Sequence, residues 1–309
     1  MIMNIKQALL WASGELKENK VYEPEKSAEF LLRQVLGSQS HSQSHTRCGI
    51  EWDKAKLLAN PDYELSLAQE KKFREFIERR RKHEPVWYIT GKIEFYGLDL
   101  EVNENVLIPR PETEFLVEEV VAVIPAEAGI QSNHIKILEL GTGSGAITLA
   151  LALEVRSSKS DVQFFASDIV EEALKIAKKN AKKLRLEKDI EFRQSDLLDN
   201  WDGEKFDIIV ANLPYIPHED LSFLALDIHR WEPRVALDGG KEGLEIYARL
   251  LLQAKDYLNE NYQMFFEIGI DQGEKLKKLA EKYLPGSEVE IKKDYGDIDR
   301  IAIISFKKA

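Results

Sequence analysis

The feature that most constrains the fold is an alternation of short apolar runs and longer amphipathic stretches, which begins at Ile135. Four apolar runs predict parallel strands: 135–140, 162–166, 190–192 and 206–211. Later segments predict a strand, a helix and a terminal strand pair: 264–268, 272–284, and 289–291 with 301–306. Repeated β-α units favour a mainly parallel sheet with helices on both faces. We therefore expect an α/β fold.

Glycines and acidic residues follow the first three predicted strands, at the edge where open α/β sheets bind ligands. The run Gly141–Gly145 lets the backbone turn tightly and approach a ligand where a Cβ atom would clash. Asp168 lies 27 positions beyond Gly141, which suits a carboxylate that accepts both hydroxyls of a ribose. Asp196 could accept the exocyclic amine of an adenine, with Leu197 against the ring.

Two cofactors fit this pattern. The spacing Gly141-x-Gly143-x-x-Ala146 matches the loose dinucleotide-binding fingerprint, so NAD is one candidate cofactor. The chain has no Walker lysine after these glycines, which argues against a nucleoside triphosphate. S-adenosylmethionine needs the same ribose-binding acid, and Glu139 could face its ammonium group. The strand ends taken together favour this methyl donor, and the candidate cofactor ligands are Glu139, Gly141, Thr142, Gly143, Ser144, Gly145, Asp168, Asp196, Leu197 and Asn212.

The fourth strand runs directly into Asn212 and then a proline turn. Pro214 has no N–H group and a fixed φ, so the chain must leave the sheet there. A side-chain amide at this edge, backed by the turn and the Tyr215 ring, can hold another planar amide or an amine. An ordinary strand exit, in which the Asn caps its own turn, is the alternative. We take Asn212, Pro214 and Tyr215 as catalytic candidates, and these three with Leu213 as the substrate contacts.

Residues 1–85 read as a helical domain. Capping boxes are expected at Asn4 with Gln7 and at Ser66 with Gln69, and a further helix should run from near Pro24 to Gly37. The basic face of the helix after Ser66 is more often solvated than a docking site. Segments 37–49 and 125–134 read as insertions, and we expect no metal at His41, His45 and Cys48, because no fourth ligand lies nearby.

From Pro85 the pattern changes to short strands, predicted at 86–89, 95–96 and 98–102. We interpret residues 86–108 as a β-hairpin linker and residues 109–309 as the catalytic domain. Thr113 is placed to cap the first helix of that domain.

Length, net charge and cysteine content indicate the number of domains, the kind of partner and the compartment to expect. A chain of 309 residues suits two domains, and a formal net charge of −11 argues against a large nucleic-acid-binding surface. Cys48 is the only cysteine, which excludes internal disulfides and favours a reducing cytoplasm. The chain shows neither a membrane-spanning apolar run nor a signal pattern.

Several motifs together resemble the peptide chain release factor glutamine methyltransferases (PrmC/HemK family), over nearly the whole chain. The most family-specific motif is Leu107-Ile108-Pro109-Arg110-Pro111-Glu112-Thr113-Glu114. The other matching stretches are 84–91, 94–98, 138–146, Ser195-Asp196, the Asn212 turn, Glu232-Pro233, 236–240 and Asp294-Tyr295 with Arg300.

The resemblance implies a class I S-adenosylmethionine-dependent methyltransferase fold and transfer of a methyl group to the glutamine side-chain nitrogen (N5) in the Gly-Gly-Gln loop of release factors. By the same resemblance, Gly141–Gly145 would line the methionine part of the donor, Asp168 would bind the ribose, and Asp196 with Leu197 would frame the adenine. The turn from Asn212 to Tyr215 would hold the glutamine. The helical domain would dock the release factor, and we expect a cytoplasmic monomer.

One position departs from the family pattern: Leu213 stands where the family has proline. Asn-Leu-Pro-Tyr is typical of ribosomal RNA adenine dimethylases, so an RNA adenine methyltransferase remains an alternative. A methyltransferase acting on a ribosomal-protein glutamine, an NAD-dependent oxidoreductase and a non-catalytic binding module also stay open.

Overall fold

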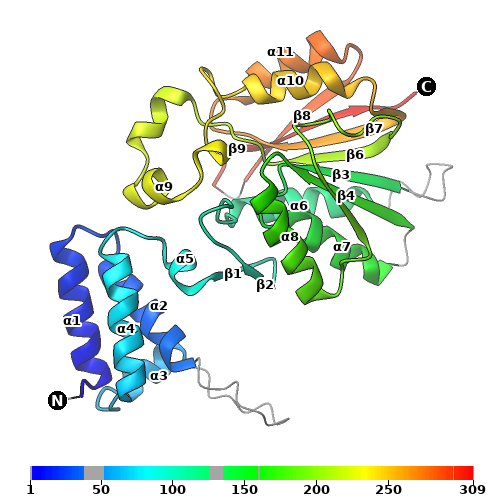
Figure 1. Cartoon of the computed structure of the whole chain (residues 1–309). Helices are drawn as coiled ribbons and strands as arrows, with labels where there is room; N and C mark the ends of the chain where they lie inside the picture. The colour runs from blue at the N-terminus through cyan, green and yellow to red at the C-terminus, as the bar shows by residue number, and fades with distance from the viewer. Residues whose placement is uncertain (1, 38–51, 125–134, 159–160, 295, 309) are drawn as a thin grey trace. The chain divides into compact units, whose positions relative to one another are not determined.

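The computed structural model describes residues 2–37, 52–124, 135–158, 161–294 and 296–308 (Figure 1). His41, His45, Cys48, Tyr295 and the expected insertion at 125–134 lie outside these ranges. The chain forms two compact units. The helical unit comprises Met1–Gly91 with Ala225–Trp231, and the sheet unit comprises Lys92–Leu224 with Glu232–Ala309.

The helical unit packs amphipathic helices around one apolar core. Its helices are α1 (Ile5–Glu18), α2 (Pro24–Gly37), α3 (Lys54–Ala59), α4 (Leu67–Arg80), α5 (Val86–Thr90) and α9 (Leu226–Trp231). Leu16, Leu31 and Phe73 are fully buried in this core, as helical spacing of apolar residues predicts. Both predicted capping boxes are confirmed, at Asn4 with Gln7 and at Ser66 with Gln69.

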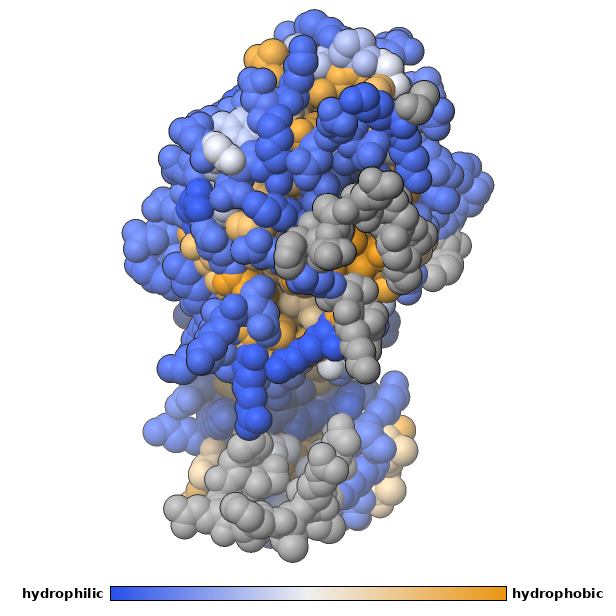
Figure 2. Space-filling model, turned by 90° about the vertical axis from the view of Figure 1, so that its right-hand side faces the viewer, coloured by the Kyte–Doolittle hydropathy of each residue, from blue (hydrophilic) through white to orange (hydrophobic). Residues whose placement is uncertain are grey.

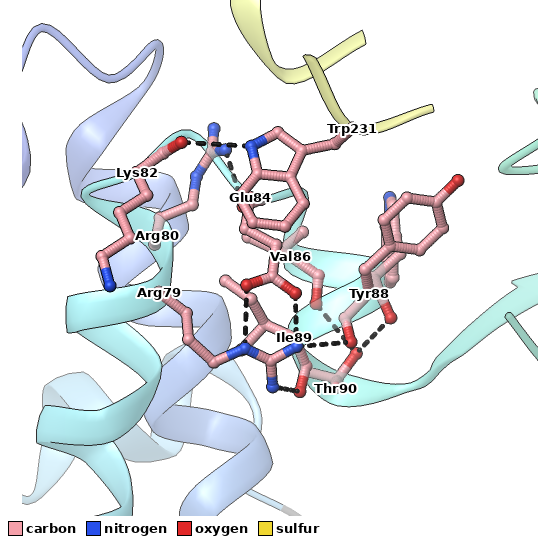
Figure 3. A network of polar contacts seen from close by, with 10 residues as sticks. Arg79, Arg80, Lys82, Glu84, Val86, Tyr88, Ile89, Thr90 and Trp231 are labelled. Atoms are coloured by element: carbon pink, nitrogen blue, oxygen red, sulfur yellow. Dashed lines mark hydrogen bonds and ion pairs between the residues drawn. The ribbon is translucent and has the colours of Figure 1, made fainter. Parts of the chain in front are cut away.

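The strand expected at 86–89 is wrong, because these residues form helix α5. The N–H groups of Tyr88 and Ile89 both donate to the Pro85 carbonyl at 3.0 Å, and Gly91 ends the helix at φ 75°. Arg79 donates to the carbonyls of Tyr88 and Ile89 (Figure 3). These tertiary contacts outweigh the strand propensity of the local sequence.

The sheet unit contains a seven-stranded sheet in the order β5-β4-β3-β6-β7-β9-β8. Its strands are β3 (Ile135–Leu140), β4 (Val162–Asp168), β5 (Ile190–Gln194), β6 (Phe206–Ala211), β7 (Leu258–Glu267), β8 (Glu288–Lys293) and β9 (Asp299–Phe306). The first five are parallel, and β9 runs antiparallel to both β7 and β8. The predicted mainly parallel sheet with an antiparallel end is confirmed.

Helices cover both faces of this sheet. They are α6 (Glu112–Val123), α7 (Ala146–Ser158), α8 (Glu171–Leu184), α10 (Glu245–Ala254) and α11 (Gly273–Tyr283). Two 3-10 helices, η3 (His218–Phe223) and η4 (Arg234–Ala236), follow β6 in the chain. Figure 1 shows α6, α7 and α8 on one face and α10 and α11 on the other. Trp201, Phe206 and Phe266 are completely buried between the layers.

A two-stranded hairpin, β1 (Lys92–Phe95) and β2 (Leu98–Glu101), belongs to the sheet unit, and the buried side chain of Asn180 connects it to the glycine run. The Asn180 side chain of α8 accepts from the N–H of Glu101 at 2.7 Å and donates to the carbonyls of Glu101 and Ser144 at 3.0 and 2.9 Å. Because Ser144 belongs to the glycine run, Asn180 fixes that run and the hairpin together.

The face of the molecule in Figure 2 is mostly hydrophilic, and its apolar side chains form small separate groups. None of the described helices is both long enough and apolar enough to cross a membrane.

Candidate active site

A cavity of about 550 Å³ lies in the sheet unit, at the carboxyl ends of β3, β4, β5 and β6. The sequence-selected residues among its lining are Glu139, Gly141, Thr142, Gly143, Ser144, Asp168, Asp196, Leu197, Asn212, Leu213 and Pro214. Gly145 and Tyr215 do not line it. Residues that follow four separate strands are thus brought to one place, as expected where parallel strands end together.

The glycine run lies across the cavity with its backbone in the left-handed region at Gly141, Gly143 and Gly145. A Cβ atom on Gly141 would lie 2.9 Å from Leu213 Cδ2, whereas one on Gly143 would point into open space. A Cβ atom on Gly145 would lie 3.3 Å from the Ala177 Cβ of α8. Gly145 therefore allows the loop to pack against α8, while Gly141 and Gly143 shape the cavity wall.

Glu139 is a buried carboxylate at the end of β3. Its Oε2 accepts from Thr142 Oγ1 at 2.7 Å and from the Thr148 N–H at 3.0 Å, and it also accepts from Thr148 Oγ1. Burial raises the pKa of Glu139 to about 7, against the opposing effect of these hydrogen bonds. A cationic group in the cavity would favour the ionised form.

Asp168 ends β4 and is held by two backbone donors. Its Oδ2 accepts from the N–H of Gly143 at 2.9 Å, and its Oδ1 accepts from the N–H of Val170 at 2.9 Å. Each carboxylate oxygen can accept more than one hydrogen bond, so both retain capacity toward the cavity. Burial raises the pKa of Asp168, while the two backbone donors oppose that shift.

Asp196 follows β5 and pairs with Arg249 of α10, whose Nη2 lies 2.8 Å from Asp196 Oδ2. Arg249 also lines the cavity and is not a residue that the sequence indicated. Leu197 is buried with φ 52°, and its carbonyl accepts from Ser195 Oγ at 2.8 Å. A leucine in the left-handed region is uncommon, and such strain clusters at ligand sites.

The Asn212 side chain is held by two buried residues, Glu267 and Thr113. Asn212 Nδ2 donates to Glu267 Oε2 at 3.0 Å and to Thr113 Oγ1 at 3.1 Å. The Thr113 hydroxyl donates to the same Glu267 oxygen at 2.7 Å. The expected capping role of Thr113 is therefore wrong: α6 begins at Glu112 without a side-chain cap. Pro111 occupies the N-cap position, and the Thr113 hydroxyl instead binds Glu267 and Asn212.

Leu213 is buried, and its side chain covers Gly141. Its N–H donates to the hydroxyl of Tyr247 at 3.2 Å, and that hydroxyl donates in turn to the Glu267 carbonyl. A proline at this position would lack the N–H donor. The hydrogen bond to Tyr247 thus secures the turn in a way that the usual proline could not.

Gly239, Gly243 and Gln272 pack against the backbone of the turn at Tyr215. A Cβ atom on Gly239 would lie 2.7 Å from Tyr215 Cα, and one on Gly243 would overlap the Tyr215 carbonyl oxygen. Gln272 Nε2 donates to that carbonyl at 2.8 Å. The Tyr215 hydroxyl donates to Glu267 Oε1 at 3.1 Å, so this ring lies behind the cavity wall and not in it.

Sequence reasoning missed Glu267, Gln272 and Tyr247. Glu267 carried a detectable signal, because it is a carboxylate near the end of the strand expected at 264–268. Phe266 pairs with Ala211, the residue before Asn212, which places Glu267 beside Asn212. Nothing local marks Tyr247 or Gln272, which lie on or next to helices on the far side of the turn.

The donor set fits S-adenosylmethionine. A buried carboxylate at Glu139 suits an ammonium group, Asp168 suits a ribose diol, and the Asp196–Leu197 pair suits an adenine edge and face. In the part of the chain that the structure describes, no group of three or more His, Cys, Asp or Glu side chains could hold a metal ion.

Comparison with known proteins decides the family. Residues 7–91 match the PrmC N-terminal domain, and residues 131–233 match a methyltransferase domain. The release factor glutamine methyltransferase of Bacillus cereus is 37% identical over 301 residues, covering 97% of this chain and 98% of that protein. The chain belongs to the release factor glutamine methyltransferase family.

The enzyme of that name from Bacillus subtilis is 36% identical and covers 95% of each chain. Among solved structures, the hMettl16 catalytic domain superposes with a TM-score of 0.53 at 16% identity, covering 78% of this chain and 82% of that one. At that identity the likeness shows the fold alone. The predicted family is confirmed, and it implies S-adenosyl-L-methionine as the cofactor.

Proposed function

We propose that this chain transfers a methyl group from S-adenosylmethionine to the N5 side-chain nitrogen of the glutamine in the Gly-Gly-Gln loop of peptide chain release factors. Family membership supports the reaction class and the substrate. The observation that carries the proposal is the Asn212 side chain at the cavity, whose NH₂ group donates to Glu267 and Thr113. Its Oδ1 is therefore turned away from them.

Each of the candidate cofactor residues would bind a different part of S-adenosylmethionine. Glu139 would accept from the ammonium group, Gly141 and Gly143 would leave room for the methionine part, and Asp168 would accept from the ribose hydroxyls. Asp196, held by Arg249, would accept from the adenine amine, and Leu197 would contact the ring. When bound, this cofactor supplies an activated sulfonium methyl group.

A carboxamide nitrogen is a poor nucleophile because its lone pair is delocalised into the carbonyl. The protein's main contribution is therefore placement, with the nitrogen held about 3–3.5 Å from the methyl carbon. Asn212 Oδ1 and the Leu213 carbonyl would accept the two amide hydrogens. Among the described residues, neither oxygen accepts another hydrogen bond, so both are available for a guest amide.

These two acceptors also stabilise the positive charge that the nitrogen gains in the transition state, because they are oriented before the reaction. Pro214 lines the cavity beside them and would exclude water from the amide, while Tyr215 supports the turn from behind. The proton can leave after transfer, so no strong base is required.

We further propose the domain roles expected from the sequence: residues 1–85 dock the release factor, 86–108 link the domains, and 109–309 carry catalysis. The reaction would take place in the cytoplasm, with the enzyme acting as a monomer. The match of residues 7–91 to the PrmC N-terminal domain supports the first of these roles.

The Asn-Leu-Pro-Tyr sequence of the turn supports a second candidate function, methylation of an adenine in RNA. Incubation with labelled methyl donor and, in parallel, release factor, ribosomal RNA or ribosomal protein separates the candidates. Label in the release factor alone is the expected result, and label in RNA alone would contradict the proposal.

A further inference from the structure

Glu267 is a buried carboxylate that the proposed mechanism does not itself use. It ends β7, next to β6, and its side chain is shielded from solvent and absent from the cavity wall. Three donors converge on it: Thr113 at 2.7 Å, Asn212 at 3.0 Å and Tyr215 at 3.1 Å. They come from α6, from the end of β6 and from the following turn, so Glu267 joins separate parts of the site.

A side-chain amide has one accepting end and one donating end of nearly the same shape, so packing alone does not select its orientation. An ionised carboxylate can only accept hydrogen bonds. When Glu267 is ionised, the NH₂ group of Asn212 must face it, and Oδ1 must face away. The opposite orientation would place two oxygens against each other in a buried setting.

We propose that Glu267 is a positioning residue, which fixes the Asn212 amide with its oxygen available to the substrate and strengthens that oxygen as an acceptor. The second effect follows from cooperativity, because an amide that donates to a charged acceptor carries more negative charge on its own oxygen. This inference rests on the proposed function, in which Asn212 Oδ1 accepts from the glutamine amide.

Thr113 completes the arrangement. Its hydroxyl donates to Glu267 and accepts from Asn212 Nδ2, so it can satisfy both only with this direction of hydrogen bonding. Thr113, the seventh residue of the family-specific run 107–114, therefore fixes the amide together with Glu267, which gives this run a role at the site.

The ionisable groups that act on Glu267 are Arg300 of β9, Glu112 of α6 and Tyr215, which also donates a hydrogen bond to it. The Tyr247 hydroxyl of α10 contacts its backbone carbonyl. Burial raises the pKa of Glu267, whereas the donors from Thr113 and Tyr215 and the charge of Arg300 oppose that shift. Protonation would make Glu267 a donor and remove the selection of the Asn212 orientation.

The test compares Glu267→Gln and Glu267→Ala with Glu281→Gln, an exposed carboxylate on α11 that gives the same change of charge. Donor affinity by calorimetry and steady-state kinetics with release factor are measured for each. We expect kcat about 10-fold lower for Glu267→Gln and about 100-fold lower for Glu267→Ala, with donor affinity nearly unchanged and the Glu281 variant unaffected.

A pH profile adds a readout that a purely structural role would not change. With the donor saturating at each pH, so that protonation of Glu139 does not limit the rate, wild-type kcat should fall on the acid side as Glu267 takes up a proton, and Glu267→Gln should lack this limb. An unchanged kcat in Glu267→Ala, or an acid limb that persists in Glu267→Gln, would overturn the proposal.

Two further measurements cover unstable variants and failure of the proposed function. Thr113→Val keeps the side-chain shape and should lower kcat without altering donor affinity; if it leaves kcat unchanged, Thr113 does not fix Asn212. Hydrogen exchange of the Asn212 NH₂ group, followed by NMR without any acceptor, should be slow in the wild type and fast in Glu267→Gln or Glu267→Ala. Equal exchange in wild type and variants would refute the positioning role, whereas failure of release factor methylation alone would not affect this result.

Discussion

At the scale of single residues, hydrogen bonds within the protein fix the orientation of the polar side chains at the site. Asn212 receives its orientation from Glu267 and Thr113, and Asp168 receives its orientation from two backbone N–H groups. Such preorganisation avoids reorientation during the reaction. The proposed chemistry would therefore use side chains whose geometry is fixed before any ligand binds.

The first prediction concerns Asn212. Replacing it by alanine removes the oxygen proposed to hold the glutamine nitrogen and should lower kcat by about 100-fold or more. Donor affinity should change much less, because Glu139 and Asp168 remain. Steady-state kinetics with release factor, together with calorimetry of donor binding, checks both. Near-normal turnover would remove Asn212 from the mechanism.

A pH effect follows from Glu139. Its pKa is raised by burial from 4.5 to about 7, so its uncharged form is favoured by folding, and the stability of the free protein should fall as pH rises from 4.5 to about 7 and then level off. The affinity for the donor should change in the opposite direction and increase with pH, because an ammonium group is attracted to the ionised carboxylate. Affinity should rise about tenfold from about pH 6 to about pH 8, following the ionised fraction.

Calorimetry across that pH range measures the effect, with Glu139→Gln as the control. The variant has no titrating group at this position, so its affinity should be weaker and nearly independent of pH. A wild-type affinity that does not change with pH would mean that Glu139 does not face the ammonium group.

Most candidate residues that the sequence indicated line the cavity, because a residue that directly follows a parallel strand must lie at the edge of the sheet; Gly145 and Tyr215 do not line it. The sequence did not predict the residues behind those that line the cavity. Thr113 follows Pro-Arg-Pro at a helix start, where a capping role is the usual interpretation, and only the position of Glu267 reveals its actual partner. That partner lies 154 positions away in the chain.

At the scale of elements, the turn from Asn212 to Tyr215 is held by contacts with neighbouring loops. Gly239 and Gly243 bring the loop before α10 against the turn, and Gln272 closes it from the start of α11. This arrangement explains how a turn with Leu213 in place of proline keeps a defined shape.

Gly243→Ala tests this packing. The added Cβ atom would overlap the Tyr215 carbonyl, and φ of 80° is unfavourable for alanine. We expect a lower Tm and a kcat at least about 10-fold lower, since small misplacements of reacting groups are costly. The matched control is Gly14→Ala on α1, where no atom lies within 4 Å. That variant should be more stable by about 1 kcal/mol, because alanine favours helix.

Helix α9 is the element whose place the sequence did not indicate. It lies between β6 and β7 in the chain yet belongs to the helical unit. Figure 3 shows the Trp231 indole directed at the Lys82 carbonyl, to which it donates at 3.1 Å. Arg80 is buried, donates to the Glu84 carbonyl at 3.0 Å and lies 3.6 Å from Asp227. Periodicity within 226–231 gives no information about such a distant partner.

Arg80→Ala should destabilise the helical unit by about 3 kcal/mol, because it removes a buried charge from its hydrogen-bond partners. Urea denaturation measures this change. Lys26→Ala, which removes an exposed ion pair with Glu23, serves as the control and should have little effect. Equal stability of the two variants would show that the Arg80 network does not hold α9.

At the scale of the whole molecule, two units with different tasks are expected: the sheet unit carries the donor site, and the helical unit is proposed to dock a protein substrate. Helical periodicity and β-α alternation over long segments indicated a helical part and an α/β part, but not that residues 225–231 belong to the helical unit. The sequence also predicted a mainly parallel sheet with an antiparallel end, but not the strand order β5-β4-β3-β6-β7-β9-β8. The acidic net charge of −11 suits a protein substrate better than RNA.

The most direct measurement is mass spectrometry of a release factor after incubation with this protein and S-adenosylmethionine. We expect one added methyl group on the glutamine of the Gly-Gly-Gln loop, formed by the wild type and nearly absent with Asn212→Ala. A release factor that stays unmodified, or carries the methyl group at another residue, would contradict it.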